Sequence, residues 1–303
     1  MKSLKDKVCG GVVAYNPEID DFRKNVQIIA EQVKELVVID NHSANIEEIK
    51  EATALLPNVV IIQNDKNYGI ARALNQILDY ADTHGYEWYL TLDQDSECSK
   101  DLVEEYSTIC NKYNELAIVC PFILNNNKVS VEEYKSMQLK ETDEITDPVA
   151  CITSASLNAV SVARSVGGYD EKLFIDCVDI DFNIRIIAAG YKILRANKAY
   201  MIQSMGKARY VPLIGVLYKM TGINLFKKLR YSPVYNNMRI YYIIRNSCYI
   251  YSKYKSAAGK RMSPAWMCGQ LIYYSITYPM SISRFEMWKT AIRGYRDAKK
   301  IGR

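Results

Sequence analysis

The chain has little histidine and lacks several patterns that define common protein classes. Its 303 residues include two histidines and eight cysteines without a C-x-x-C pair, so no pattern typical of a zinc site is present. The scattered cysteines are typical of reduced, mostly buried thiols in a cytosolic protein. The first residues have no long apolar region of the signal-peptide kind. No G-x-G-x-x-G follows the first apolar run, which argues against a dinucleotide-binding enzyme.

Acidic residues are nearly absent from the last third of the chain. Residues 207–303 contain 19 Lys and Arg against two acids, whereas residues 1–206 contain 20 basic and 32 acidic residues. The same last third holds 13 of the 24 tyrosines and two of the three tryptophans. A cationic, aromatic-rich region suits an anionic membrane surface or a nucleic acid. We therefore predict two domains, an α/β domain at 1–206 and a helical, basic extension at 207–303.

A membrane-spanning helix is not predicted, although 22 uncharged residues separate Arg261 from Arg284. This run contains two prolines, a glycine, a glutamine and several Ser, Thr and Tyr, which a spanning helix rarely combines. Helices that lie in the membrane interface fit the composition better. Such helices are expected around Trp266, Tyr273, Tyr274 and Trp288.

The first two-thirds of the chain alternate apolar runs with amphipathic stretches. This alternation predicts strands near residues 8–14, 36–39, 59–62, 87–92 and 116–119, with helices between them. Such βαβ units form a largely parallel sheet, whose strands end at one edge. Asn16, Asp40, Asn67 and Asp93 each follow a strand, so we expect them to line one crevice.

Two carboxylates follow the fourth predicted strand. If the extended backbone continues through Asp95, the side chains of Asp93 and Asp95 point the same way. Their hard oxygen atoms suit Mg²⁺ or Mn²⁺, ions that commonly hold phosphate groups. A strand-ending acidic turn, or a helix N-cap at Asp95 and Ser96, is the alternative interpretation.

Two further segments carry polar side chains suited to a nucleotide. Asp40 can accept a hydrogen bond from the N3–H of a uracil or thymine ring, or it can close an Asx turn. Gly69 precedes a helix whose free N–H groups favour an anion. Arg72 and Asn75 lie on one face of that helix, either near the anion or facing solvent.

A second acidic segment follows a glycine-rich turn. It contains Asp176, Asp179 and Asp181, and Arg185 lies four residues after the last of them, at salt-bridge spacing. We predict that Asp179, Asp181 and Arg185 lie off a buried helical stripe formed by Ile180, Ile184 and Ile187. A carboxylate beside a metal-held phosphate is a natural general base for an incoming hydroxyl.

The order of these motifs resembles the family 2 GT-A glycosyltransferases. The matching runs are 12–17, 38–43, 67–71, 92–96 and 174–182. Residues 152–156, the Phe174-Ile175-Asp176 run and residues 241–246 resemble the rhamnosyltransferase branch, which uses dTDP-L-rhamnose. The resemblance spans roughly residues 8–250.

The resemblance implies a GT-A (Rossmann-like) fold and inverting transfer of a deoxyhexose to a hydroxyl of a lipid-linked cell-surface glycan. A UDP-hexose is the alternative donor. Asp179 would be the catalytic base, Asp95 would bind Mg²⁺ or Mn²⁺, and Asp93 would face the ribose or diphosphate. Tyr15 and Asp40 would contact the base. Further donor contacts would be Asn67, Arg72 and Gln94, and the acceptor or diphosphate side would include Asp176, Asp181, Arg185 and Gln203.

Gln203 marks a departure from the family pattern. The family often has a His-x-x-Gly element whose histidine helps to hold the metal, and the matching run here is 203–206. A glutamine offers a carbonyl oxygen instead, which suits a weaker or more Mg²⁺-like site.

The resemblance also implies a cytoplasmic enzyme, peripheral on the inner face of the cell membrane, without a nucleic-acid partner. Homo-oligomerisation is left open. Two rival functions use the same residues. A Mg²⁺-dependent phosphohydrolase would use Asp93 as its nucleophile. A non-enzymatic membrane or nucleic-acid adaptor would depend on the basic extension alone.

Overall fold

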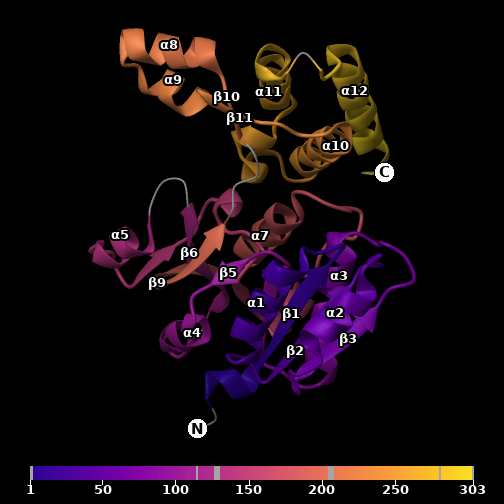
Figure 1. The fold of residues 1–303 in the computed structure, drawn as a ribbon, viewed down its shortest axis with the longest axis vertical. Helices are drawn as coiled ribbons and strands as arrows, with labels where there is room; N and C mark the ends of the chain where they lie inside the picture. The colour runs from indigo at the N-terminus through magenta and orange to yellow at the C-terminus, as the bar shows by residue number, and fades with distance from the viewer. Residues whose placement is uncertain (1–2, 114, 126–129, 204–207, 280, 302–303) are drawn as a thin grey trace. The chain divides into compact units, whose positions relative to one another are not determined.

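The protein is described here by a computed structural model covering residues 3–113, 115–125, 130–203, 208–279 and 281–301. The chain divides into two compact units, Met1–Gln203 and Ser204–Arg303, called the N-terminal unit and the C-terminal unit below (Figure 1). The predicted domain boundary, between residues 206 and 207, lies outside the described residues. Each unit is described by itself.

The N-terminal unit begins with alternating strands and helices. The strands are β1 (Val8–Ala14), β2 (Glu35–Asp40), β3 (Val59–Gln63) and β4 (Trp88–Asp93). The helices between them are α1 (Ile19–Ala30), α2 (Ile46–Thr53) and α3 (Ile70–Thr83). β1 pairs in parallel with both β2 and β4, and β2 pairs in parallel with β3. These pairings confirm the predicted α/β class with a mostly parallel sheet.

The strand register brings the predicted polar side chains to one edge of this sheet. Ala14 at the end of β1 pairs with Asp40 at the end of β2, and Asp40 pairs with Gln63 of β3. On the other side of β1, Val13 pairs with Asp93. The loops that follow these strands therefore start from the same edge, as expected for parallel strands.

Beyond β4 the sheet becomes mixed. Its remaining strands are β5 (Glu97–Cys98), β6 (Leu116–Asn125), β7 (Thr142–Glu144), β8 (Ser156–Ala159) and β9 (Lys192–Gln203). β8 lies antiparallel between β4 and β6, β6 runs parallel to β9, and both β5 and β7 pair antiparallel with β9. The helices of this half are α4 (Leu102–Cys110), α5 (Val131–Ser136), α6 (Val160–Ser165) and α7 (Val178–Ala188).

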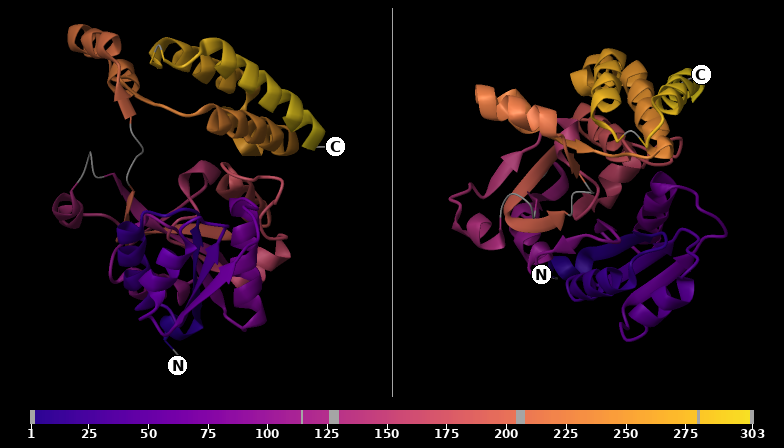
Figure 2. Two further views of the ribbon diagram at one scale, coloured as in Figure 1. Left: turned by 45° about the vertical axis from the view of Figure 1, so that its right-hand side comes forward. Right: turned by 45° about the horizontal axis from the view of Figure 1, so that its top comes forward.

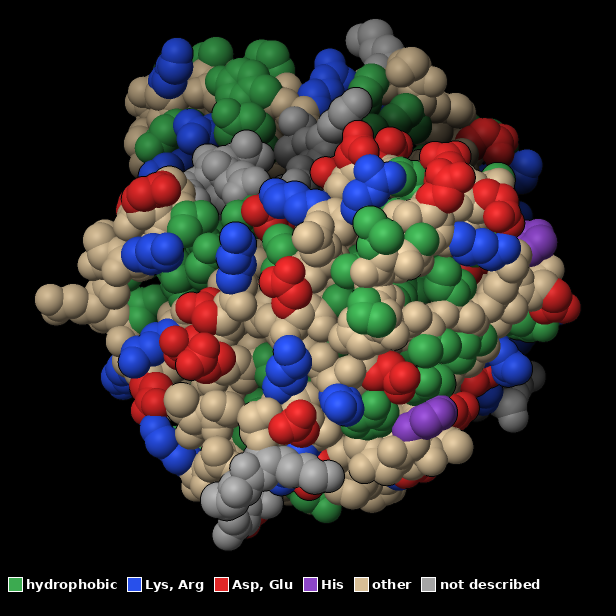
Figure 3. Space-filling model, turned by 60° about the horizontal axis from the view of Figure 1, so that its bottom comes forward, with side chains coloured by type: hydrophobic (Ala, Val, Ile, Leu, Met, Phe, Trp, Pro, Cys, Tyr) green, Lys and Arg blue, Asp and Glu red, His purple; other side chains and the backbone are tan. Residues whose placement is uncertain are grey.

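The core of the N-terminal unit forms where helix stripes cover the sheet. Every residue of β1 is buried, and α1 buries Phe22, Val26 and Ile29, which recur at helical spacing. Each such side chain contributes about 1.5–3 kcal/mol on burial. The surface, unlike the apolar core, carries many charges: acidic and basic side chains lie interspersed over the face seen in Figure 3.

The C-terminal unit is mostly helical. Its elements are β10 (Ala208–Tyr210), α8 (Pro212–Thr221), α9 (Asn224–Leu229), β11 (Tyr231–Pro233), α10 (Asn237–Tyr254), α11 (Pro264–Thr277) and α12 (Arg284–Ile301). α10 and α12 lie side by side (Figure 2). A Cβ atom on Gly294 would lie 2.8 Å from the backbone oxygen of Tyr241, so this glycine permits the close approach of the two helices.

The membrane-related predictions fall on this unit. Among the described residues, none of the helices has both the length and the apolar character needed to cross a bilayer. Of the aromatic residues around which interfacial helices are predicted, Trp266 is exposed. Tyr274 is buried, where it stacks on Tyr278, so its side chain does not face a membrane surface. The indole N–H of Trp288 donates to Ser275.

Candidate active site

The loops after β1 and β4 meet at the carboxyl edge of the sheet. Tyr15 follows β1 and is about half exposed, and its backbone N–H donates to Oε1 of Gln94 at 2.8 Å. Asn16 has a positive φ of 47° and is held in that conformation by two bonds. Its N–H donates to Ser43 Oγ at 2.9 Å, and its Oδ1 accepts the N–H of Ala44 at 2.7 Å. Gln94 thus joins two loops predicted to contact the donor.

Asp40 occupies the end of β2 and is fully buried. Its two carboxylate oxygens accept the backbone N–H of Ser43 at 3.0 and 3.3 Å, which is the Asx-type turn that the sequence allows. A direct contact between this carboxylate and a base therefore requires a local rearrangement. Its role at the base stays a prediction.

A network of asparagine side chains fixes the loop before α3. Asn41 donates to Asn67 Oδ1 at 3.0 Å and to the carbonyl of Gly69 at 3.2 Å. Its own oxygen accepts bonds from Asn64 Nδ2 and the N–H of Tyr68. Sequence reasoning singled out Asn67 but missed Asn41 and Asn64. Their position directly after β2 and β3 is the signal that identifies them.

The predicted anion site at the start of α3 is partly occupied by the protein itself. The N–H of Ile70 donates to the carbonyl of Phe174 at 2.7 Å, so this group is not free for an anion, contrary to expectation. A Cβ on Gly69, whose φ is 86°, would lie 2.5 Å from the same carbonyl oxygen. Only glycine allows this contact, which ties α3 to the segment preceding the second acidic group.

Arg72 and Asn75 lie on one face of α3, as predicted, and both contact Glu171. The Arg72 guanidinium pairs with this carboxylate at 3.0 Å and stacks over Tyr68, and Asn75 donates to it at 3.1 Å. Asn75 also bonds both the N–H and the carbonyl of Tyr169. The charge of Arg72 is therefore paired in the structure, and its predicted contact with a diphosphate would replace an exposed ion pair.

The chain turns immediately after Asp93, so the strand does not extend through Asp95 and the alternative interpretation, a strand-ending acidic turn, is the one that the structure has. Gln94 and Asp95 form a turn, closed by a bond from the N–H of Ser96 to the carbonyl of Asp93 at 3.3 Å. The physical reason is that β5 must pair antiparallel with β9 from Glu97 onward. Asp95 is exposed at this turn, whereas Asp93 is half-buried.

The carboxylates of the two acidic segments lie within electrostatic range of one another although they are far apart in the sequence. Burial raises the pKa of Asp93 to about 6, with further contributions from the negative charges of Asp95 and Asp179. Burial also raises the pKa of Asp179 to about 6, against two backbone hydrogen bonds that lower it, and the charge of Asp176 raises it further. The three carboxylates of Asp93, Asp95 and Asp179 therefore share one electrostatic neighbourhood.

Asp179 lies in the first turn of α7, directly after a segment with an unusual backbone conformation. Asp176 and Cys177 have φ values of 65° and 64°, a conformation that costs non-glycine residues about 1–3 kcal/mol each. Such strain persists where the surrounding structure holds it, and the bond from Ile70 to Phe174 lies directly before these residues. A pKa near 6 suits a general base at neutral pH.

Asp181 is buried, so the prediction that it lies off the buried stripe of α7 is wrong. α7 packs against residues on more than one side, and Ile186 is buried where Ile187 was expected to be. The carboxylate of Asp181 pairs with Arg185 at 2.6 Å, and Arg185 also donates to the carbonyl of Val166 at 2.5 Å. This pair has the geometry of the structural salt bridge that its spacing predicts.

Gln203 ends β9 at the same edge of the sheet and is exposed. β5 pairs antiparallel with β9 through Glu97 and Ile202. Continuing this register by one residue sets Gln203 opposite Ser96, next to Asp95. The rest of the run that departs from the family pattern, residues 204–206, lies outside the described residues.

The donor set fits a divalent cation that also binds substrate. Within the described ranges, no three His, Cys, Asp or Glu side chains gather closely enough to hold a metal ion alone. Mg²⁺ commonly uses one or two carboxylates, completed by substrate phosphates and water. Asp93 and Asp95 offer such oxygens, and a cation would relieve the repulsion that raises the pKa of Asp93.

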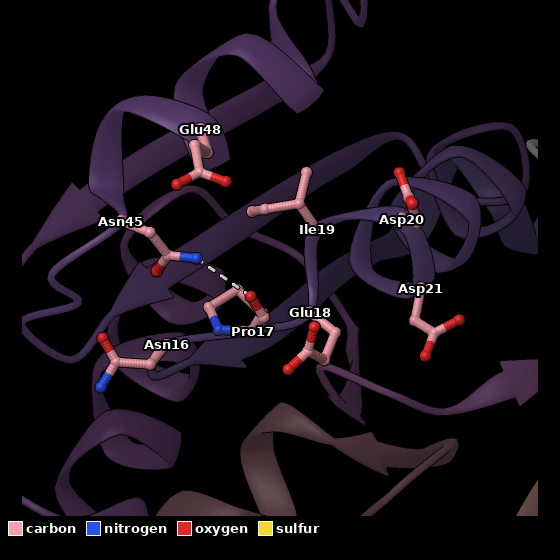
Figure 4. A pocket seen from close by; sticks show the side chains of 8 residues that line it. All are labelled: Asn16, Pro17, Glu18, Ile19, Asp20, Asp21, Asn45 and Glu48. Carbon is pink, nitrogen blue, oxygen red and sulfur yellow. Dashed lines mark hydrogen bonds between the residues drawn. The ribbon is translucent and has the colours of Figure 1, made fainter.

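A hollow of about 730 Å³ opens beside Asn16, between the starts of α1 and α2 (Figure 4). Its lining includes the carboxylates of Glu18, Asp20, Asp21 and Glu48. A diphosphate would be repelled by so many negative charges in the absence of cations. None of the residues predicted to bind the donor, the metal or the acceptor lines this hollow.

The architecture is that of GT-A glycosyltransferases. GalNAc-T7, solved with UDP, GalNAc and Mn²⁺, superposes with a TM-score of 0.60 at 11% identity, over 97% of this chain and 54% of that one. This chain thus spans about half the length of GalNAc-T7. Residues 1–349 of TarS from S. aureus, solved with UDP-GlcNAc, superpose with a TM-score of 0.53 at 16% identity, over 97% and 90% of the two chains. Both likenesses concern the fold alone.

Sequence comparison points to the same class of protein. Residues 11–155 match the model of glycosyl transferase family 2. Over 254 residues, the chain is 27% identical to the dTDP-rhamnosyl transferase RfbF of Shigella flexneri, covering 80% of this chain and 79% of that protein. These matches confirm the resemblance of the chain's motifs to the family 2 glycosyltransferases and to their rhamnosyltransferase branch.

Proposed function

We propose that this glycosyltransferase transfers L-rhamnose, with inversion, from dTDP-L-rhamnose to a hydroxyl of a lipid-linked cell-surface glycan. The observation that carries the proposal is the shared electrostatic environment of Asp93, Asp95 and Asp179, in a unit whose first part matches the family 2 model. The similarity to a dTDP-rhamnosyl transferase supports the donor. The basic composition of the C-terminal unit supports an acceptor at a membrane.

The proposed reaction is a single displacement at the anomeric carbon. Asp179 accepts the proton of the acceptor hydroxyl while its oxygen forms the new glycosidic bond. The bond between the anomeric carbon and the diphosphate breaks, and dTDP leaves with the electron pair. Asp93 and Asp95 would hold Mg²⁺ or Mn²⁺, which supplies charge neutralisation for the leaving dTDP.

The remaining predicted residues surround this centre in the proposal. Tyr15, Asp40, Asn67 and Gln94 would contact the nucleotide, and their loops start from the same sheet edge. Asp176 and Gln203 would face the acceptor or the diphosphate. Arg185 would act through Asp181, since the two form a buried ion pair. We further propose a cytoplasmic enzyme, peripheral on the inner face of the cell membrane.

A nucleotide-release assay tests the proposal. The wild-type chain and Asp95→Ala are incubated with dTDP- and UDP-sugars in the presence of Mg²⁺, Mn²⁺ or EDTA. We expect slow release of dTDP from dTDP-rhamnose, lost with EDTA and in the variant. Release from a UDP-hexose alone would overturn the rhamnose assignment and keep the mechanism. No nucleotide release, together with no nucleotide binding by calorimetry, would favour a non-enzymatic adaptor.

A further inference from the structure

The α8–α9 hairpin exposes an apolar surface. Gly215 is the one buried residue of α8, although the helix is mostly apolar. The exposed side chains, with their exposed fractions, are Leu213 (68%), Val216 (51%), Met220 (78%), Ile223 (50%) and Leu225 (58%). Leu213, Val216 and Met220 follow i, i+3, i+7 spacing and therefore share one face of α8. In Figures 1 and 2 the hairpin stands apart from α10 and α12.

This exposure belongs to a structured element. β10 and β11 pair at the base of the hairpin, and the hydroxyl of Tyr273 donates to the carbonyl of Leu229 at 2.7 Å. Tyr210 lies directly against Gly215, where a Cβ atom would clash with its ring. The guanidinium of Arg230 stacks over Tyr218 at 5.4 Å. The hairpin is thus fixed by contacts on one side while its apolar side chains point to solvent.

The charge around this surface identifies its occupant. Lys219 and Lys227 lie on the hairpin itself, and no Asp or Glu occurs in the sequence between Asp181 and Glu286. A second copy that docked through the same hairpin would present the same positive charge, which opposes self-association through this surface. An anionic bilayer complements both properties, because it accepts apolar side chains and attracts Lys and Arg.

We propose that the α8–α9 hairpin inserts its apolar side chains into the interface of an anionic lipid bilayer, with Lys219 and Lys227 at the lipid phosphates. The inference rests on the proposed function, because it supplies the contact that brings the enzyme to a lipid-linked acceptor. In this proposal α8 and α9 form the principal lipid contact. Tyr274, near which an interfacial helix is predicted, is buried and does not contribute.

Vesicle flotation tests the inference without donor or acceptor. Vesicles of phosphatidylglycerol and phosphatidylethanolamine are compared with vesicles of phosphatidylcholine, for the wild-type chain and the double variant Leu213→Glu/Met220→Glu. We expect wild-type protein to float with the anionic vesicles at low salt. The variant should partition into the vesicles about tenfold less, or more weakly still, since two apolar side chains that would enter the lipid are replaced by charged ones. The matched control is Leu55→Glu in the N-terminal unit, where Leu55 is 94% exposed, and it should float like wild type.

Several outcomes would overturn the inference. Wild-type protein that stays in the soluble fraction, or a double variant that floats as well as wild type, would exclude the hairpin as the lipid contact. A concentration-dependent dimer that the double variant abolishes, without vesicle binding, would show that a second copy covers the surface. Circular dichroism and dTDP release in solution check that the variant is folded. Vesicle binding with neither release of any nucleotide nor nucleotide binding by calorimetry would reject the proposed function and leave the lipid contact standing.

Discussion

The two units differ in where they keep their apolar side chains and their charge. The N-terminal unit closes its apolar residues inside the sheet and exposes few large ones, at scattered positions: Tyr15, Leu55, Tyr113, Met137 and Leu139. The C-terminal unit, about half as long, exposes large apolar side chains on α8, α9, α11 and α12. Its charge is strongly positive, while residues 1–206 are net acidic.

This difference indicates a division of labour. In the N-terminal unit, a well-packed sheet holds a few polar groups at its edge, where burial changes their pKa values. In the C-terminal unit, we propose that the surface itself is the functional feature. Variants in the two units should therefore affect different measurements, and each prediction below tests that separation.

The largest expected effect is on catalysis in the N-terminal unit. Asp179→Asn removes the proposed general base and should lower kcat for rhamnose transfer by about 10²–10⁴-fold. Binding of dTDP-rhamnose, measured by calorimetry, should persist, and so should vesicle flotation. Glu48→Gln, an exposed carboxyl in the acidic hollow, is the control and should keep its kcat. Full activity of Asp179→Asn would remove Asp179 from the mechanism.

Two glycines with positive φ, Gly69 in the N-terminal unit and Gly222 in the C-terminal unit, differ in how closely other atoms pack around them. A Cβ on Gly69 would meet the Phe174 carbonyl at 2.5 Å, so Gly69→Ala should destabilise the protein by about 2–4 kcal/mol in urea unfolding. Gly222 has a φ of 67° with no atom within 4 Å of its Cβ position, so Gly222→Ala should cost only about 1 kcal/mol. Equal costs would contradict the contact between α3 and the segment before Asp179.

The raised pKa of Asp93 predicts a substitution that stabilises the protein, in contrast to the two glycine substitutions. The folded state binds this proton up to about pH 6, whereas the unfolded chain releases it near 3.8, so stability falls as pH rises between these values. Neutral Asp93→Asn should therefore raise the free energy of unfolding at pH 7.5 by about 1–3 kcal/mol. Near pH 4 the gain should vanish.

Thermal unfolding across this pH range measures the effect. Asp20→Asn is the control, because the Asp20 side chain is fully exposed, and it should leave the pH dependence unchanged. A destabilised Asp93→Asn at pH 7.5 would mean that the carboxylate is favourably bound in the folded protein, which contradicts the account.

The smallest stability effect is expected at Arg72. Its pair with Glu171 is exposed, so Arg72→Gln should change the free energy of unfolding by less than about 1 kcal/mol. If Arg72 leaves Glu171 for the donor diphosphate, the KM for dTDP-rhamnose should rise several-fold while kcat changes little. An unchanged KM would confine Arg72 to the surface pair.

The sheet edge could be predicted from the sequence because it depends on local patterns. Apolar runs that end in Asp40 and Asp93 give both the strands and the polar positions, and the structure has both at the predicted edge. The meeting of Asp93 with Asp179 is not local. It was inferred from the resemblance to a family, since strand and helix patterns alone do not specify which loops meet.

Two positions differ from what the sequence pattern alone suggests, Asp181 and Asp95, and in both the cause is long-range packing. Asp181 has helical spacing typical of a surface salt bridge, but α7 is covered on several sides, and this covering is decided by tertiary packing. Asp95 lies in a turn because β5 pairs with β9, a strand about 100 residues later in the chain. Long-range pairing decides both positions, and no short-range pattern records it.

The central claim is that Asp93 and Asp179 form one site. Carboxyl NMR of ¹³C-labelled aspartate tests this claim most directly. In the wild-type chain we expect two aspartates to titrate near pH 6. Asp179→Asn should lower the pKa of Asp93. Asp95→Asn alone should lower the pKa of Asp93 by a larger amount, because the charge of Asp95 contributes more to its shift than the charge of Asp179. A pKa of Asp93 that does not change in Asp179→Asn would mean that the two carboxylates do not meet, which would contradict the account.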